Sequence, residues 1–146
     1  MKALIQRVSR AKVTIKAKEI SSIKRGMLVF LGVERGDAEK DIHFMAKKLA
    51  NLRIFEDEAG KMNLSIKEIK GEMLVVSQFT LAADLRRGNR PSFDAAESPE
   101  RAEKIYEELI REVIKEGIPV KEGVFGAMME IELVNDGPVT FMLESR

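Results

Sequence analysis

Hydrophobic and polar residues alternate along much of the chain, and a period of two is typical of strands with one buried face. Alternation or short apolar runs predict eight strands, most of them bounded by residues that favour turns. The predicted strands are residues 3–8, 12–17, 19–23, 27–33, 52–55, 73–79, 128–134 and 139–143. The chain is therefore expected to be rich in β-structure.

Two stretches follow the period of a helix instead. Residues 37–52 place Ile42, Met45 and Leu49 on one face. A second helix is expected to begin with Ser98 as its N-cap and Pro99 in its first turn, and to end at Gly117. Its apolar stripe consists of Ala102, Ile105, Tyr106, Leu109 and Val113.

Short turns separate most of the predicted strands, at residues 24–26, 57–60 and 135–138. Such turns join antiparallel neighbours, because a parallel connection needs a dozen or more residues. We therefore predict an α+β fold, in which a curved, mainly antiparallel sheet or partial β-barrel carries two packed helices. At 146 residues, the whole chain is expected to form one domain.

Composition narrows the function classes. The longest apolar run, residues 26–33, is far shorter than the roughly 20 residues of a membrane span. The first seven residues become polar before an apolar signal-peptide region has formed. We expect a cytoplasmic protein without membrane contact.

The chain has no cysteine and one histidine. A thiolate nucleophile and a cysteine-based zinc cluster are therefore excluded. His43 lies about 100° around its predicted helix from Ile42, which favours a solvent-facing position over a catalytic or metal-binding one. We expect neither a metal nor a cofactor.

The net charge of +1 conceals an asymmetry. Residues 1–25 hold eight basic residues and one acid, a local charge of about +7. This segment is either an anion-binding face or the solvated side of a strand whose lysines protect a sheet edge.

Polar residues interrupt an apolar strand at Ser77, Gln78 and Thr80. Buried polar groups need partners, because an unsatisfied one costs about 1–3 kcal/mol. The partner is either a ligand or a neighbouring strand and turn.

A second candidate segment is 135–140, Asn-Asp-Gly-Pro-Val-Thr. Asn-Asp-Gly favours a hairpin turn, but Pro138 cannot donate to a strand ladder, and a Gly-Pro bond is one of the few that adopt the cis form. Either a plain turn or a projecting pair of carbonyls fits the pattern.

Two further segments have a composition that suits RNA. Phe125 is followed by Gly126, Ala127 and Met128, so that a planar base could stack there, or Phe125 could simply belong to the core. Arg86, Arg87 and Arg90 lie between two aspartates without an acid among them. This loop suits phosphate contact, or it is merely solvated.

Taken together and in order, these segments resemble the bacterial D-aminoacyl-tRNA deacylase family, formerly called D-tyrosyl-tRNA deacylase. The resemblance covers nearly the whole chain and departs from the family at Ala82, where a larger side chain is expected. The matching segments are residues 3–8, 51–55, 62–65, 77–81, 90–93, 125–127 and 135–140.

The resemblance implies a homodimer with two sites at the subunit interface. Gly137-Pro138, cis in the family, would reach into the partner's pocket, exclude an L-side chain and accept from the α-ammonium of the substrate. Arg7 resembles the residue that steadies this dipeptide. Phe125 and Gly126, followed by Ala127 and Met128, resemble the wall that receives the terminal adenine of tRNA. The substrate would be D-aminoacyl-tRNA, and glycyl-tRNA would be accepted in part.

We expect chemistry without a side-chain nucleophile, because an aminoacyl ester is already activated. Backbone N–H groups near Phe79 and Thr80 are candidate oxyanion donors, and each donor contributes roughly 10²–10³ in rate. The substrate's own 2′-OH would help to activate water. Two alternatives are a Thr80 nucleophile, for which no base is evident, and a non-catalytic nucleic-acid-binding barrel. A simple esterase is disfavoured, since the chain lacks Gly-x-Ser-x-Gly.

Overall fold

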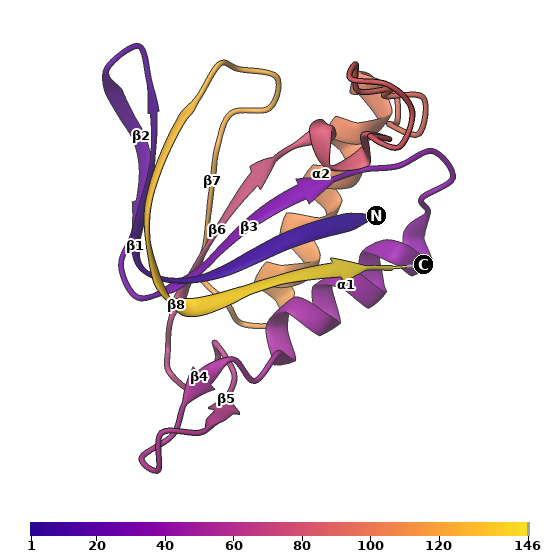
Figure 1. Ribbon diagram of the computed structural model, residues 1–146. Coiled ribbons are helices and arrows are strands. Elements are labelled where there is room, and N and C mark those ends of the chain that lie inside the picture. Colours follow the sequence, from indigo (N-terminus) through magenta and orange to yellow (C-terminus); the bar gives the residue numbers. More distant parts are fainter. Residues whose placement is uncertain (146) are drawn as a thin grey trace.

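The computed structural model describes residues 1–145. A strongly curved sheet has two helices packed along one of its faces (Figure 1). The elements are β1 (Lys2–Ile15), β2 (Lys18–Ile23), β3 (Gly26–Gly32), α1 (Glu39–Asn51), β4 (Phe55–Glu56), β5 (Met62–Leu64), β6 (Glu72–Ser77), the 3₁₀ helix η1 (Phe79–Ala82), α2 (Pro99–Lys115), β7 (Val120–Glu122) and β8 (Glu130–Glu144).

The sheet is built around β1, which pairs with β2, β3 and β8, and all three pairings are antiparallel. The remaining pairings of this sheet, β3 with β6 and β6 with β7, are parallel. They are parallel because long connections containing α1 and α2 return the chain across the sheet. The predicted α+β class and the curved, mainly antiparallel sheet with two helices are confirmed, and these two parallel pairings are an addition.

Two predictions of separate strands were wrong. Residues 3–8 and 12–15 belong to the continuous strand β1, and most of residues 128–143 form β8. The segment 135–138 is not a hairpin turn but part of β8, where the register with β1 shifts between Gln6 and Arg10. These shifts interrupt the alternation of buried and exposed positions, so the sequence pattern breaks where the strand continues.

The β1–β2 hairpin turns at Lys16 and Ala17, which have φ of 48° and 63°. Two-residue hairpin loops favour this left-handed conformation, which Asn and Gly adopt most easily. The turn residues here are neither, so no residue type marked the turn, and residues 16 and 17 were wrongly predicted to lie in a strand.

Other boundaries also differ from the predictions. The strand predicted for residues 73–79 ends at Ser77, and the chain then enters η1. The strand predicted for residues 52–55 is reduced to β4, and Met128 lies before β8. The short strands β5 and β7 were not predicted.

Hydrophobic side chains alternate between the two faces of β3 and β6. Met27, Val29 and Leu31 belong to the core beneath the helices, and Leu28 belongs to a second cluster on the opposite face. The curvature of the sheet encloses this second cluster against residues of β8, so both faces of β3 are covered.

The helices confirm the predicted apolar stripes. Ile42, Met45 and Leu49 are fully buried or nearly so, and the stripe of α2 is buried along its length. Ser98 is the N-cap residue, but its hydroxyl makes no capping hydrogen bond. Among the described residues, no helix is long and apolar enough to cross a membrane.

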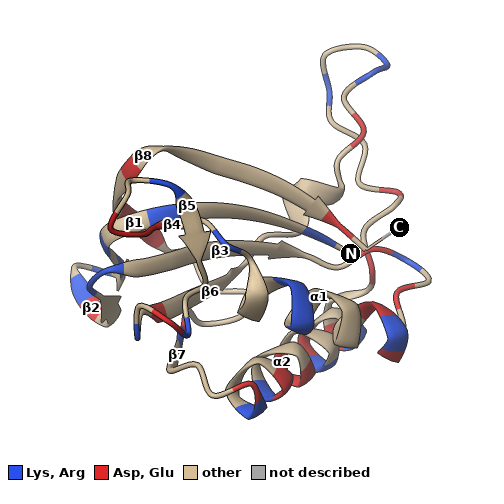
Figure 2. Ribbon diagram, turned by 90° about the horizontal axis from the view of Figure 1, so that it is seen from below, with Lys and Arg blue, Asp and Glu red and all other residues tan. Residues whose placement is uncertain are grey.

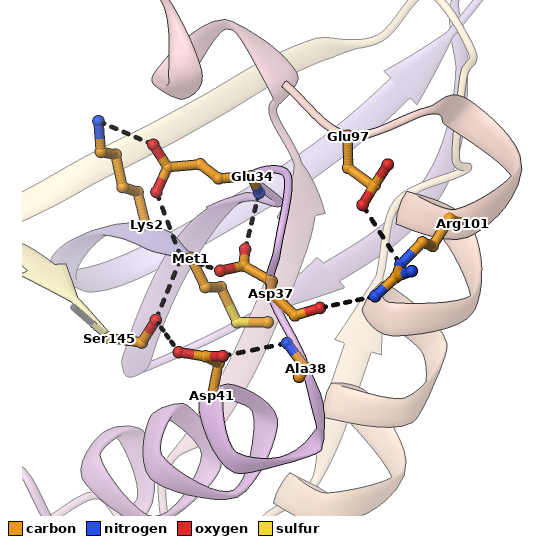
Figure 3. A network of polar contacts seen from close by, with 9 residues as sticks. All are labelled: Met1, Lys2, Glu34, Asp37, Ala38, Asp41, Glu97, Arg101 and Ser145. Atoms are coloured by element: carbon orange, nitrogen blue, oxygen red, sulfur yellow. Dashed lines mark hydrogen bonds and ion pairs between the residues drawn. The ribbon is translucent and has the colours of Figure 1, made fainter. Parts of the chain in front are cut away.

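A buried ionic network joins the start of β1 to both helices and to the end of β8 (Figure 3). The Met1 ammonium donates to Asp37 Oδ1 at 2.7 Å, and both groups are fully buried. It also donates to Glu34 and to the Ser145 hydroxyl, which in turn donates to Asp41. The network fixes both ends of the described chain to the N-terminus of α1.

Candidate functional site

A cavity of about 520 Å³ opens where the end of β6, the start of α2 and the segment after β7 meet. Two distant segments of candidate site residues from the sequence analysis meet here. Seven of these residues line the cavity: Ser77, Gln78, Phe79, Phe125, Gly126, Ala127 and Met128. Most of the remaining lining is apolar. The volume lies in the range of ordinary small-molecule sites.

Polar residues reach the cavity because β6 ends there. Leu74 to Val76 are buried, and the chain then leaves the sheet with Gln78 N–H donating to the Leu31 carbonyl at 2.7 Å. Ser77 and Gln78 are half-buried. A buried strand therefore delivers two polar side chains to one end of a mostly apolar cavity.

Thr80 lies beside this cavity rather than in its lining. Its hydroxyl accepts a hydrogen bond from the Gln78 side-chain amide. Part of the hydrogen-bonding capacity of Gln78 and Thr80 is thus met within the cluster itself. This agrees with the alternative that these side chains bond to the protein rather than to a ligand.

The N–H groups of Phe79 and Thr80 open the 3₁₀ helix η1. The first N–H groups of a helix have no acceptor within it. Within residues 1–145 no backbone acceptor contacts either group, whereas the N–H groups of Leu81 and Ala83 donate to Gln78 and Thr80. Two backbone donors therefore remain available close to Ser77 and Gln78.

An aromatic wall bounds another side of the cavity. The rings of Phe125 and Tyr106 lie 5.8 Å apart at 53°. The buried Tyr106 hydroxyl donates to the Val75 carbonyl at 2.8 Å, and burial raises the pKa of Tyr106. Gly126, with φ of 72°, leaves open space where a side chain would stand. This wall is aromatic, and it is open at the Gly126 backbone.

Nine further lining residues were not nominated from the sequence: Leu31, Val33, Val76, Glu97, Pro99, Ala102, Tyr106, Met129 and Ile131. Tyr106 and Ala102 were predicted as core residues of the second helix, and no signal in the sequence distinguished a cavity wall from a core. Glu97 is the one charged side chain that lines the cavity among the described residues, and it pairs with Arg101 at 3.2 Å.

Arg86, Arg87 and Arg90 lie outside the cavity, on a loop that stands away from the sheet and helices (Figure 2). Asp84 and Ser92 close this loop with two backbone hydrogen bonds, of 2.8 and 3.1 Å. Arg86 binds both carboxylate oxygens of Asp84, and these bonds lower the pKa of Asp84. Arg87 and Arg90 are exposed, and neither contacts an acid within residues 1–145.

Gly137 and Pro138 are exposed on β8, do not line the cavity of their own chain, and are joined by a cis peptide bond. Arg7 holds the segment just before them: its Nε donates to the Asp136 carbonyl at 2.8 Å. Arg7 is 5% exposed, and its Nη1 donates to the Ile54 carbonyl at 2.8 Å. The structure thus connects Arg7 to the residue that precedes the dipeptide, and neither Arg7 nor the dipeptide lines the cavity.

The side chain of His43 is 53% exposed and interacts with Glu39 and Glu112. This position confirms the prediction that it faces solvent. Across residues 1–145, no group of three or more histidine, aspartate or glutamate residues is arranged to hold a metal ion.

Known proteins resemble this chain along its full length. The family model described as D-Tyr-tRNA(Tyr) deacylase matches residues 4–144. The D-aminoacyl-tRNA deacylase of Thermodesulfovibrio yellowstonii is 54% identical over all of both chains. That of Magnetococcus marinus is 56% identical, over 99% of this chain and 96% of the relative.

Two solved structures share the fold. One, named c-Myc DNA Unwinding Element Binding Protein, has a TM-score of 0.94 at 43% identity and covers 100% of this chain and 99% of its own. Another, described as a probable eukaryotic D-amino acid tRNA deacylase, has a TM-score of 0.84 at 17% identity with 97% of each chain covered, and it supports the fold alone. By its family match and its full-length relatives, this chain belongs to the D-Tyr-tRNA(Tyr) deacylase family of hydrolases.

Proposed function

We propose that this protein hydrolyses the ester that links a D-amino acid to the 3′-terminal adenosine of tRNA. The observation that carries the proposal is a cavity that has Ser77 and Gln78 at one end and Phe125 with Gly126 on its wall. The polar end can form hydrogen bonds to an ester, and the aromatic wall can stack against a base. Two relatives over 50% identical along the full chain are named for this activity.

In the proposed reaction, water attacks the ester carbonyl carbon, the bond to the ribose oxygen breaks, and that oxygen takes a proton. The Phe79 and Thr80 N–H groups would donate to the oxyanion, and the neighbouring 2′-OH of the substrate would help to activate the water. Ser77 and Gln78 would position the ester. No metal or cofactor is required by this scheme.

The protein is proposed to act as a homodimer in which each site is completed across the interface. Gly137 and Pro138 are exposed and lie outside the cavity of their own chain, and Arg7 anchors the residue before them. The outer edge of β8 has no paired strand among residues 1–145, and it exposes Phe141 and Met142 by 41% and 50%. An unpaired strand edge with exposed apolar side chains can pair with a second copy of the chain.

Chiral selection would follow from this arrangement. The carbonyls of Gly137 and Pro138 of the partner subunit would occupy the space that an L-side chain needs and accept from the α-ammonium. A D-side chain would point away from them. Glycine has no side chain to exclude, so glycine wrongly attached to tRNA-Ala would also be hydrolysed from it.

The cellular role that fits this activity is proofreading in the cytoplasm during translation. The tRNA would approach from the side of Arg86, Arg87 and Arg90, whose loop is positively charged and exposed. Ala127 and Met128 would complete the binding surface for the terminal adenosine, since Met128 is 92% exposed beside Phe125.

A non-catalytic nucleic-acid-binding protein is the second candidate, and the name of the 43% identical structure refers to DNA binding. Turnover separates the two. Purified protein is mixed with a hundredfold excess of D-tyrosyl-tRNA, and free D-tyrosine is followed over time. Release of many equivalents per protein supports the deacylase, whereas binding without release supports the second candidate.

A further inference from the structure

Two phenylalanine rings lie exposed at the rim of the cavity. Phe79 is 59% exposed although it also lines the cavity, and Phe93 is 39% exposed. Their ring centroids are 5.1 Å apart at an interplanar angle of 60°. Large aromatic surfaces that stay in contact with water commonly mark a binding surface. We refer to this pair as the Phe79–Phe93 platform.

The platform is attached to the arginine loop. Phe93 directly follows Ser92, which pairs with Asp84 to close the loop that carries Arg87 and Arg90. Neither arginine contacts an acid within residues 1–145, so both charges are available to a ligand. Exposed aromatic rings beside unneutralised basic residues are the combination that binds single-stranded nucleic acid, because bases stack on the rings and phosphates meet the cations.

The size of the cavity limits how much of the substrate it can hold. A cavity of about 520 Å³ has room for an aminoacyl group and one nucleoside, but not for a second nucleotide. The RNA strand must therefore leave the cavity at its rim, where Phe79 both lines the cavity and is exposed to solvent. In tRNA the nucleotide before the terminal adenosine is an unpaired cytidine.

We propose that the Phe79–Phe93 platform stacks the penultimate cytidine of the tRNA, while Arg87 and Arg90 contact phosphates on the 5′ side of that cytidine in the acceptor strand. The inference rests on the proposed function and extends it by one nucleotide. It assigns to Phe93 a role in substrate affinity rather than in ester chemistry.

The test compares two small substrates, the D-tyrosyl ester of adenosine and the D-tyrosyl ester of cytidylyl-adenosine. For the unaltered protein, the added cytidine is expected to raise kcat/KM about tenfold through stacking. Phe93→Leu is expected to abolish most of this gain, and Phe93→Tyr to keep it, because only the second retains an aromatic face. Phe44→Leu is the matched control, since Phe44 is 38% exposed on α1; its gain is expected to equal that of the unaltered protein.

If the rise in kcat/KM from the added cytidine survives in Phe93→Leu, the proposal is overturned. It is also overturned if Phe44→Leu loses this rise to the same extent as Phe93→Leu. Sedimentation of the same variants identifies the competing occupant: if Phe93→Leu changes self-association and leaves the cytidine gain intact, the platform binds a second copy instead.

Failure of the proposed function is seen separately, as no release of D-tyrosine from either ester by the unaltered protein. In that case the affinity for uncharged cytidylyl-adenosine still decides the inference. Weaker binding to Phe93→Leu than to Phe93→Tyr supports the platform, and equal binding overturns it.

Discussion

Glu34 shows how the charged network around Met1 depends on pH. Its carboxylate is partly buried, which opposes ionisation, but hydrogen bonds from Lys2 and from the Met1 ammonium prevail and lower the pKa of Glu34 below its usual 4.5. A depressed pKa in the folded chain means that the stabilisation is complete above pH 4.5 and is lost as the pH falls through the folded value.

The variant Glu34→Gln should therefore lose about 1 kcal/mol of unfolding free energy at pH 7, and its deficit should shrink as the pH falls below 4.5. Urea unfolding of both proteins, measured from pH 7 downward, tests this. Glu103→Gln, at an exposed position of α2, serves as the control with no deficit. A deficit that stays constant with pH would contradict this account of Glu34.

Thr80 tests whether a side chain attacks the ester. Its hydroxyl accepts from Gln78, and among residues 1–145 it makes no hydrogen bond to a histidine or lysine that could act as a base. Thr80→Ala keeps its backbone N–H, so it should retain deacylation within about tenfold of the unaltered protein. Single-turnover release of D-tyrosine measures this, and a loss of a thousandfold or more would establish Thr80 as the nucleophile.

At the residue scale, the sequence indicated the two distant segments that meet in the cavity, because each breaks an apolar pattern with polar or small residues. It did not indicate Glu97 or Tyr106. Tyr106 follows the apolar stripe of α2, and the stripe looks the same whether its outer end faces a core or a cavity. Only the three-dimensional arrangement distinguishes the two.

Among the elements, the loop closed by Asp84 and Ser92 is expected to govern the salt dependence of tRNA binding. Each phosphate contact to a single strand contributes about 0.7 to the slope of log affinity against log salt. Replacing both Arg87 and Arg90 by alanine should reduce that slope by about 1.4.

The matched variant replaces Lys16 and Lys18, which lie at the β1–β2 hairpin within the basic first 25 residues. Filter binding of tRNA at several salt concentrations compares the two double variants. An unchanged slope in the arginine variant, with a reduced slope in the lysine variant, would place the tRNA on the hairpin instead.

Sequence periodicity predicted the helices better than the long strands. Both helices present unbroken stripes, whereas β1 and β8 contain irregular positions where the alternation changes phase. At Asn135 to Pro138 the local turn chemistry was strong enough to suggest a hairpin, but pairing with β1 continues on both sides of the segment. Long-range pairing thus overrode a local preference, which a single sequence cannot reveal.

For the whole molecule, the central expectation is that each site uses residues of two subunits. A Cβ at Gly137 would lie 2.0 Å from Asn135 Oδ1, so Gly137→Ala must displace the Asn135 side chain and disturb the segment. Both Gly137→Ala and the cavity variant Phe125→Ala should be poorly active as homodimers. In a mixed dimer of the two, one site regains an intact cavity together with an intact Gly137 segment.

Refolding the two inactive variants together should therefore restore about a quarter of the activity of the unaltered protein. This figure assumes that half of the dimers are mixed and that one site in each is complete. D-tyrosine release before and after mixing measures it. If mixing restores nothing although mixed dimers form, the Gly137 segment acts within its own chain or not at all.

The most direct test of the account is the ratio of kcat/KM for D-tyrosyl-tRNA to that for L-tyrosyl-tRNA, measured with the unaltered protein under identical conditions. A site that excludes the L-side chain predicts rapid release of D-tyrosine while the L-ester decays no faster than without protein. Release of both enantiomers at similar rates would contradict the proposed chiral selection.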